Sequence, residues 1–145
     1  MSQTPIYNPA DLSPPGSPAT HSHTHTHPAR LVIGVGALAG ALVANPPDRL
    51  LLRNYWATSF TITELHYEVR TAPAGSGITI ELRKNGVAVH TATISSAATR
   101  ANYTGLSITW DADDSLEMVP TAVGATTPGS TLTGMAVATA AGSGL

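Results

Sequence analysis

The segment 77–94, GITIELRKNGVAVHTATI, is the feature that most constrains the fold of this chain. Ile78, Ile80 and Leu82 alternate with polar residues, which is the period of a β-strand with one dry and one wet face. Asn85-Gly86 follows, the pair that best tolerates the positive φ angles of a two-residue type I′ turn. Residues 87–94, rich in Val, Thr and Ile, suit the returning strand. An isolated hairpin is marginal in water, so the rest of the chain must extend the sheet.

Short strand-like segments separated by turn signals make up most of the remaining sequence. Only 11% of the 145 residues are charged, and 13 Gly and 11 Pro are present, which is typical of a turn-rich all-β protein or of a subunit covered by neighbours. Strands are expected at 30–35, 49–54, 60–71, 78–83, 87–94, 106–110, 115–123 and 131–140. We predict a single antiparallel β-sandwich, jelly-roll-like with about eight strands, at 30–145, preceded by an extended Pro-rich arm at 1–29.

Two of these strands carry irregularities. Within 60–71 the apolar residues change phase near Thr63, so that Phe60 and Ile62 fall on one face and the residues at 65, 67 and 69 on the other. This change predicts a β-bulge or a bend between sheets. Pro120 lies inside 115–123, which indicates an edge or a bulge because proline cannot donate to the ladder. Tyr55 and Trp56 adjoin the second strand; we expect them in the core, and the alternative is an exposed contact.

Several classes of function are disfavoured by composition. The net charge is −2 and Lys84 is the single lysine, which argues against nucleic-acid binding. The chain has no cysteine, so disulfides and thiolate metal sites are excluded. A secretory signal begins with basic residues, and residues 1–20 contain none. The apolar run 31–44 is too short to span a bilayer as a helix.

No residue stands out as a catalyst, and we predict that the protein is not an enzyme. His66 and His90 are each expected to be surface residues rather than general bases. The acidic run Asp111–Asp114 departs from the EF-hand pattern, because Leu116 occupies the required glycine position, and is expected to form a solvated turn. The glycines at 34, 36 and 40 do not have the GxGxxG spacing of a dinucleotide-binding loop.

Four histidines, His21, His23, His25 and His27, alternate with Ser and Thr. In an extended chain they would lie along one edge about 6.5 Å apart. One chain cannot easily close a metal shell with such a row, whereas three chains around a threefold axis could place three imidazoles in each layer, a set suited to Fe, Zn or Ni. The alternatives are a solvated linker, axial packing without metal and, less favoured, a purification tag.

The arm before this histidine track is rich in proline and cannot bury enough apolar surface to fold alone. We expect it to bind a partner, through its apolar and proline residues: Pro5, Ile6, Tyr7, Pro9, Leu12, Pro14 and Pro15.

The order of several short motifs resembles a β-sandwich module of tailed-bacteriophage virion proteins. These motifs are Thr71-Ala72-Pro73, Ile78-Thr79-Ile80, Lys84-Asn85-Gly86, Asp114-Ser115-Leu116, Val123-Gly124 and Thr126-Thr127-Pro128-Gly129-Ser130. The resemblance covers about residues 31–140, and the HxH pattern of the arm is similar to that of trimeric phage fibres. In the family the module often ends a long fibre, whereas here it follows a short arm.

This resemblance implies a non-enzymatic structural protein at the surface of a phage particle, made in the host cytoplasm. The expected role is a capsid decoration (cement) or short spike subunit that docks on major capsid protein or tail components through its arm. The resemblance also implies that the subunit forms a homotrimer. The alternative is a tail-tip or fibre protein that binds a host receptor or surface glycan. Its recognition loops would be Tyr55–Ser59, Ser95–Tyr103 and Asp111–Asp114, since loops on rigid sandwiches carry recognition.

Overall fold

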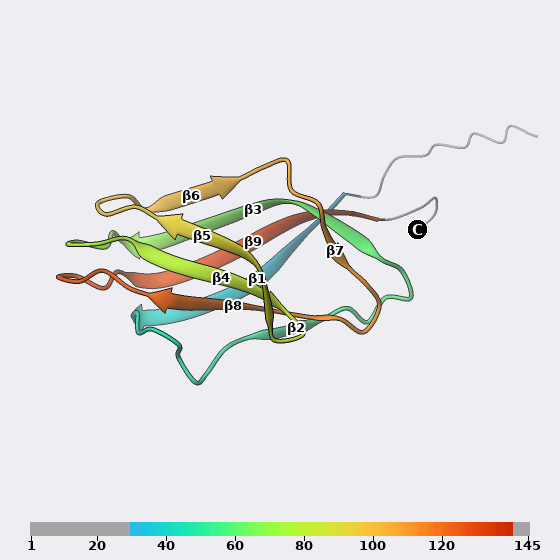
Figure 1. The fold of residues 1–145 in the computed structure, drawn as a ribbon, viewed down its shortest axis with the longest axis horizontal. Helices are drawn as coiled ribbons and strands as arrows, with labels where there is room; N and C mark the ends of the chain where they lie inside the picture. The colour runs from blue at the N-terminus through green and yellow to red at the C-terminus, as the bar shows by residue number, and fades with distance from the viewer. Residues whose placement is uncertain (1–29, 141–145) are drawn as a thin grey trace, which may run out of the picture.

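The computed structural model describes residues 30–140, which form nine β-strands in two packed sheets (Figure 1). The strands are β1 (Arg30–Ala41), β2 (Leu51–Arg53), β3 (Phe60–Thr71), β4 (Ile78–Lys84), β5 (Val87–Ile94), β6 (Arg100–Tyr103), β7 (Ile108–Trp110), β8 (Ser115–Ala122) and β9 (Ser130–Ala140). All pairings are antiparallel. The predicted β-sandwich is confirmed.

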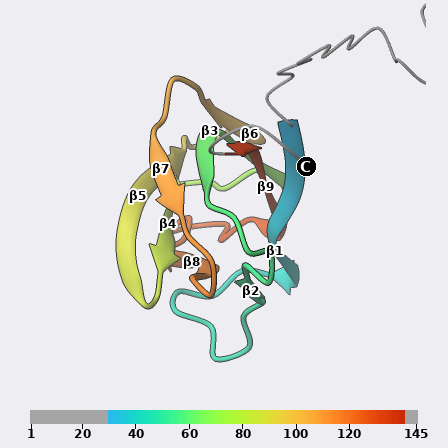
Figure 2. The same cartoon turned by 90° about the vertical axis from the view of Figure 1, so that its right-hand side faces the viewer.

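The two sheets have the strand arrangement of a jelly roll. One sheet has the order β1-β9-β3-β6 and the other the order β2-β8-β4-β5. The strands β6 and β7 pair with different halves of β3, so together they occupy one edge position. Eight strand positions are therefore filled by nine strands, and β6 falls where the sequence predicted only a loop. Figure 2 shows the two layers seen along the sandwich.

The bulge predicted near Thr63 is present, but its consequence differs from the expectation. The register of β3 against β9 shifts between Ile62 and Glu64. This shift turns both apolar sets of β3 toward the same side, so that Phe60, Ile62, Leu65, Tyr67 and Val69 are all buried. The prediction that they occupy opposite faces was wrong, because one unpaired residue restores the phase of the strand.

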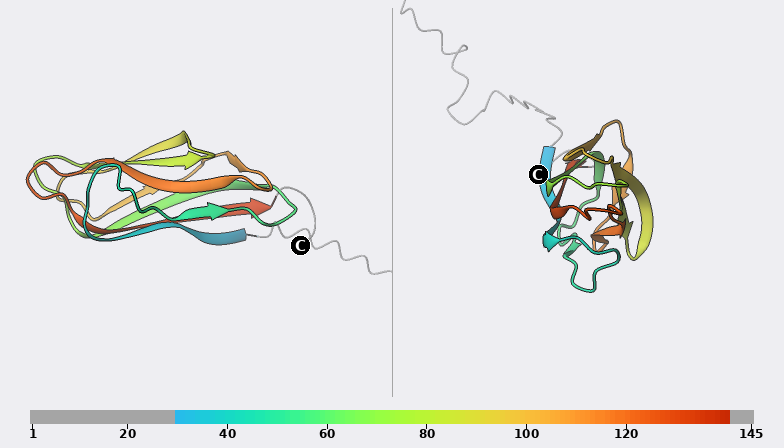
Figure 3. Two further views of the ribbon diagram at one scale, coloured as in Figure 1. Left: turned by 90° about the horizontal axis from the view of Figure 1, so that it is seen from below. Right: turned by 90° about the vertical axis from the view of Figure 1, so that its left-hand side faces the viewer.

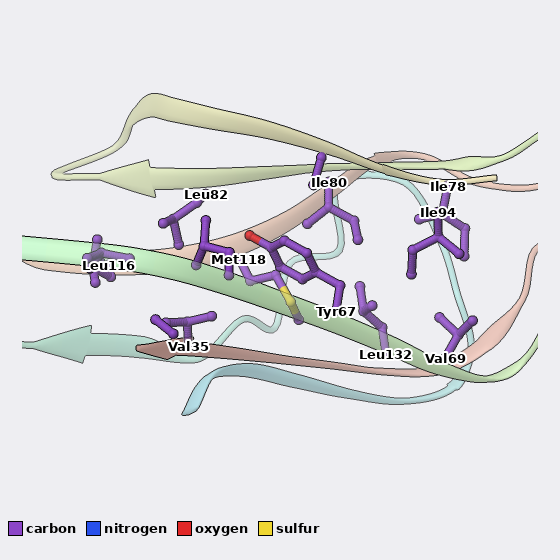
Figure 4. Packing of buried hydrophobic residues seen from close by; sticks show 14 of the residues in the cluster. Val35, Tyr67, Val69, Ile78, Ile80, Leu82, Ile94, Leu116, Met118 and Leu132 are labelled. Atoms are coloured by element: carbon purple, nitrogen blue, oxygen red, sulfur yellow. The ribbon is translucent and has the colours of Figure 1, made fainter. Parts of the chain in front are cut away.

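The core between the sheets draws on every long strand (Figure 4). Tyr67 of β3 faces Ile80 and Leu82 of β4, Val69 lies opposite Ile78 and Ile94, and Met118 of β8 lies between the layers. Trp110 and Phe60 are the largest side chains buried toward one end. A closed apolar interior of this kind is what holds the hairpin β4–β5 in place.

Strand β1 continues well beyond the predicted end at residue 35. Its glycines lower strand propensity, but Gly36 is required by close packing: a Cβ there would lie 2.7 Å from Met118 Cε. Register shifts occur between Gly34 and Gly36 and again between Leu38 and Ala41. The strand is therefore long but irregular, which single-residue propensities do not capture.

The bulge alternative for Pro120 is confirmed. Strand β8 lies inside its sheet, between β2 and β4, and the register against β4 shifts between Thr79 and Ile80, where Pro120 pairs. Its carbonyl oxygen accepts a hydrogen bond from Asn45 N at 2.7 Å. The proline thus occupies a position where a regular ladder bond is absent, and its carbonyl ties down the segment that follows β1.

Candidate docking surface

The two ends of the sandwich differ in character. One end, here called the arm end, comprises the loop 54–59, the turn 85–86 and the turn 111–114, with Arg30, which joins the arm, and Ala140 (Figures 1 and 3). The opposite or far end comprises the loops 72–77, 95–99 and 123–129. Two of the three predicted recognition loops therefore meet at the arm end, while the segment 95–103 begins at the far end, where Ala97 N donates to Pro73 O.

An aromatic cluster forms the base of the arm end. Trp110 is fully buried, and Trp56 lies edge-on to it and to Phe60, with ring centroids 6.1 and 5.5 Å apart. Trp56 nevertheless keeps 44% of its surface exposed, and Tyr55 keeps 84%. The prediction that both belong to the core was wrong for Tyr55 and only partly right for Trp56, because the chain leaves the sheet immediately after Arg53.

Asn54 fixes this loop from beneath. Its side chain is fully buried and donates to Thr58 O at 3.0 Å and to Trp110 O at 3.1 Å, while its Oδ1 accepts from Trp56 N at 3.0 Å. Satisfied buried amides of this kind hold a loop in one conformation. Sequence reasoning missed Asn54, because an asparagine at a strand end is more often a turn residue.

The turn 111–114 is bound to its neighbours through Asp114. The carboxylate accepts from Asn85 Nδ2 at 2.6 Å and from Asp111 N at 2.9 Å, and it lies 3.5 Å from Lys84 Nζ. The hydrogen bond from Asn85, followed by that from the backbone of Asp111, lowers the pKa of Asp114 below its ordinary value. Asp111 and Asp113 are exposed, which confirms the predicted solvated turn.

A second link joins the turn 111–114 to the aromatic loop. Ser59 Oγ donates to Asp111 Oδ1, and Asp113 N donates to Asn54 O at 2.8 Å. The two exposed aromatic residues and the two exposed carboxylates thus belong to one rigid surface. Within residues 30–140 no three His, Asp or Glu side chains are grouped to hold a metal ion.

Large apolar side chains are exposed unevenly along the molecule. Tyr55, Trp56 and Val87 lie at the arm end, and Leu50 and Leu51 lie on the flank beside it. The three far-end loops contain only Ala, Gly, Ser, Thr, Pro and one Val. Exposed aromatic side chains are therefore found at the arm end, whereas the three far-end loops consist of small, uncharged residues.

The two histidines within the sandwich have different environments. His66 lies on the outer face, with Nε2 3.0 Å from Glu64 Oε2 and Nδ1 2.8 Å from Asn102 Oδ1, which confirms it as a surface residue. His90 is half-buried: it pairs with buried Leu82, lies edge-on to Tyr103 with ring centroids 4.8 Å apart, and has an Nδ1 buried without a partner. Burial lowers the pKa of His90. His90 lies on the same face of β5 as the buried Ala92 and Ile94.

The predicted metal residues His21, His23, His25 and His27 lie outside the described residues, as do the predicted partner-binding residues of the arm. No described helix is long and apolar enough to cross a membrane. Comparison with models of known protein families and with curated proteins finds no match.

Proposed function

We propose that this protein is a non-enzymatic structural subunit of a bacteriophage particle, a capsid decoration (cement) or short spike protein. It attaches by its arm end and its N-terminal arm to major capsid protein or tail components, and the far end points outward. The observation that carries this proposal is the contrast between the two ends: the end joined to the arm also bears Tyr55, Trp56 and Val87.

Exposed aromatic side chains in a fixed loop favour an interface. Contiguous apolar surface on a soluble protein generally marks an interaction site, and Tyr and Trp are enriched in the energetically important centres of interfaces. Because Asn54 already holds the loop, little conformational entropy is lost when a partner covers it. The three far-end loops carry neither charge nor an aromatic side chain, which suits loops that remain in solvent.

The jelly-roll arrangement supports the same assignment at the level of analogy. Jelly rolls recur in viral capsid proteins, and also in lectins and cupins, so the fold alone does not select a function. The motif order that resembles phage virion modules favours a viral structural role over that of a lectin or a cupin. In this role the protein acts by burying surface between subunits rather than by chemistry.

The test is particle incorporation. Phage particles made in cells that express this chain are purified on a density gradient, probed with antibody and imaged by electron cryomicroscopy. We expect copies over the capsid lattice or at a spike, and a loss of incorporation of at least tenfold in a Tyr55→Ala, Trp56→Ala double variant. Met135→Ala, which truncates an exposed apolar residue on the outer sheet face, is the matched control and should incorporate normally. Absence of the wild-type chain from purified particles rejects the proposal.

A second candidate is a tail-tip or fibre protein that binds a host glycan. It is favoured by the proximity of Tyr55 and Trp56 to the exposed carboxylates of Asp111 and Asp113, since sugars are bound by aromatic faces together with a few placed hydrogen-bond acceptors. A glycan array separates the candidates: binding that is lost in Trp56→Ala, with copies confined to the tail, supports the second and contradicts the first.

A further inference from the structure

Strand β1 is the unprotected edge of this sandwich. The other edge positions are held by β2, β6 and β7, of three, four and three residues, and by β5. The edge of β5 is occupied at Thr93, whose N–H donates to Tyr103 OH at 2.7 Å and whose carbonyl oxygen lies 3.3 Å from the same hydroxyl. In contrast, β1 has 12 residues, no proline and Arg30 as its single charge, and within residues 30–140 it pairs with β9 alone. Long neutral edges of this kind readily accept a further strand.

A groove of about 400 Å³ runs beside the second half of β1. It is lined by Ala37, Leu38, Ala39, Ala41, Leu42, Val43, Pro46, Pro47 and Asp48, so it is apolar except at one position. The segment that follows β1 forms the opposite wall and swings outward before it returns to β2 (Figure 2). Hydrogen bonds from Leu42 N to Gly129 O at 3.0 Å and from Asn45 N to Pro120 O hold this wall. Val43 remains 57% exposed.

We infer that this groove and the adjacent edge of β1 bind the arm segment Pro5–Leu12 of a second copy of the chain. The inference rests on the proposed function in that it assumes copies gathered side by side. The segment, PIYNPADL, supplies Ile6, Tyr7 and Leu12 for an apolar groove. Its prolines favour an extended conformation and are tolerated in a strand added at an edge, where alternate N–H groups face away from the ladder.

The arm of another copy fits this position better than the chain's own arm. From Arg30, β1 runs away from the arm end toward the groove, so a chain's own arm would have to reverse direction close to Arg30 to follow it. Two-residue hairpin turns favour Gly, Asn or Asp because they need positive φ, and none of these occurs between Ala19 and Ile33, so a tight hairpin onto β1 is disfavoured there. The arm of a neighbour needs no such turn, since 29 extended residues span up to about 95 Å.

Disulfide trapping tests the inference, because the chain has no cysteine of its own. The full-length double variant Tyr7→Cys, Val43→Cys is oxidised with copper phenanthroline, which joins the two thiols and takes up their electrons. We expect a ladder of disulfide-linked dimers and larger species on a non-reducing gel. A linked monomer, lighter by two hydrogens in the mass spectrum, overturns the assignment to a second copy. Absence of any linkage overturns the groove as the binding site.

Two further variants control for collision and for misfolding. Tyr7→Cys, Ser96→Cys places the second thiol in a far-end loop, and we expect less than a tenth of the linked fraction. Ala39→Trp, added to the first pair, fills the groove from an exposed position and should lower linkage at least tenfold while the circular dichroism spectrum is unchanged. All of these readouts use free protein and do not depend on the particle experiment. If the chain forms the linkage but is absent from particles, the proposed function is rejected and this inference stands.

Discussion

At the scale of single residues, Tyr67 is the clearest departure from ordinary packing. It is 1% exposed, its hydroxyl has no hydrogen-bond partner, and burial followed by the proximity of Tyr103 raises its pKa above the ordinary range. Tyr67→Phe removes an unsatisfied polar atom and keeps the ring, so we expect the free energy of unfolding to rise by about 1 kcal/mol. Urea unfolding monitored by fluorescence measures this change.

Tyr103→Phe is the matched control for that prediction. Its hydroxyl accepts a hydrogen bond from Thr93 N, so its removal should lower stability by about 1 kcal/mol. A destabilised Tyr67→Phe protein would indicate that the Tyr67 hydroxyl is satisfied by a bound water and would contradict the prediction.

Because its pKa is lowered, His90 should make the free energy of unfolding depend on pH. Burial lowers its pKa, so between that lowered value and the ordinary value near 6.5 the unfolded chain binds more protons than the folded one. The contribution of His90 to stability is therefore complete above about pH 6.5 and declines as the pH falls through this window. His90→Phe keeps an aromatic ring against Tyr103 and should lose less stability than wild type between pH 7.5 and 5. Equal pH slopes of the two proteins would refute the assignment.

At the scale of elements, the tip of the β4–β5 hairpin is joined to the start of β8 through Asn85. Its φ is 51°, and its side chain donates to Asp114 Oδ1 and accepts from Ser115 N at 2.8 Å. Asn85→Gly keeps the positive φ and loses the hydrogen bonds, at a cost of about 1–2 kcal/mol. Asn85→Ala adds about 1 kcal/mol of backbone strain. Chemical denaturation of both variants separates the two effects, and equal stabilities would exclude the strain contribution.

The same elements show what local pattern can and cannot determine. Asn85-Gly86 and the alternation around it placed the hairpin correctly, and β3 has the predicted bounds, because turn chemistry and period-two burial act over a few residues. The common face of the two halves of β3 depends on a bulge, whose effect on register is set by the partner strand. The exposure of Tyr55 depends on how the loop 54–59 meets the distant turn 111–114, and no single segment of the sequence determines that contact.

At the scale of the whole molecule, the contrast between the ends bears on how copies assemble. A net charge of −2 on 145 residues opposes association only weakly. If neighbours stand side by side with their arm ends on a particle, their arms start at a common level, and three arms can converge with their histidine tracks on one axis. That arrangement would place three imidazoles in each layer, as an axial metal requires.

The last prediction is therefore that the full-length chain forms a homotrimer that depends on the histidine track. Size-exclusion chromatography with light scattering should give the trimer mass, and metal analysis should find Fe, Zn or Ni in the purified trimer. Replacing His21, His23, His25 and His27 with Ala should remove the metal and lower the trimer fraction, because neutral imidazoles are the ligands. Replacing Ser22, Thr24 and Thr26 with Ala is the matched control and should leave both unchanged. A trimer of unaltered mass that contains no metal in either form would eliminate the metal role and leave apolar contacts as the basis of assembly.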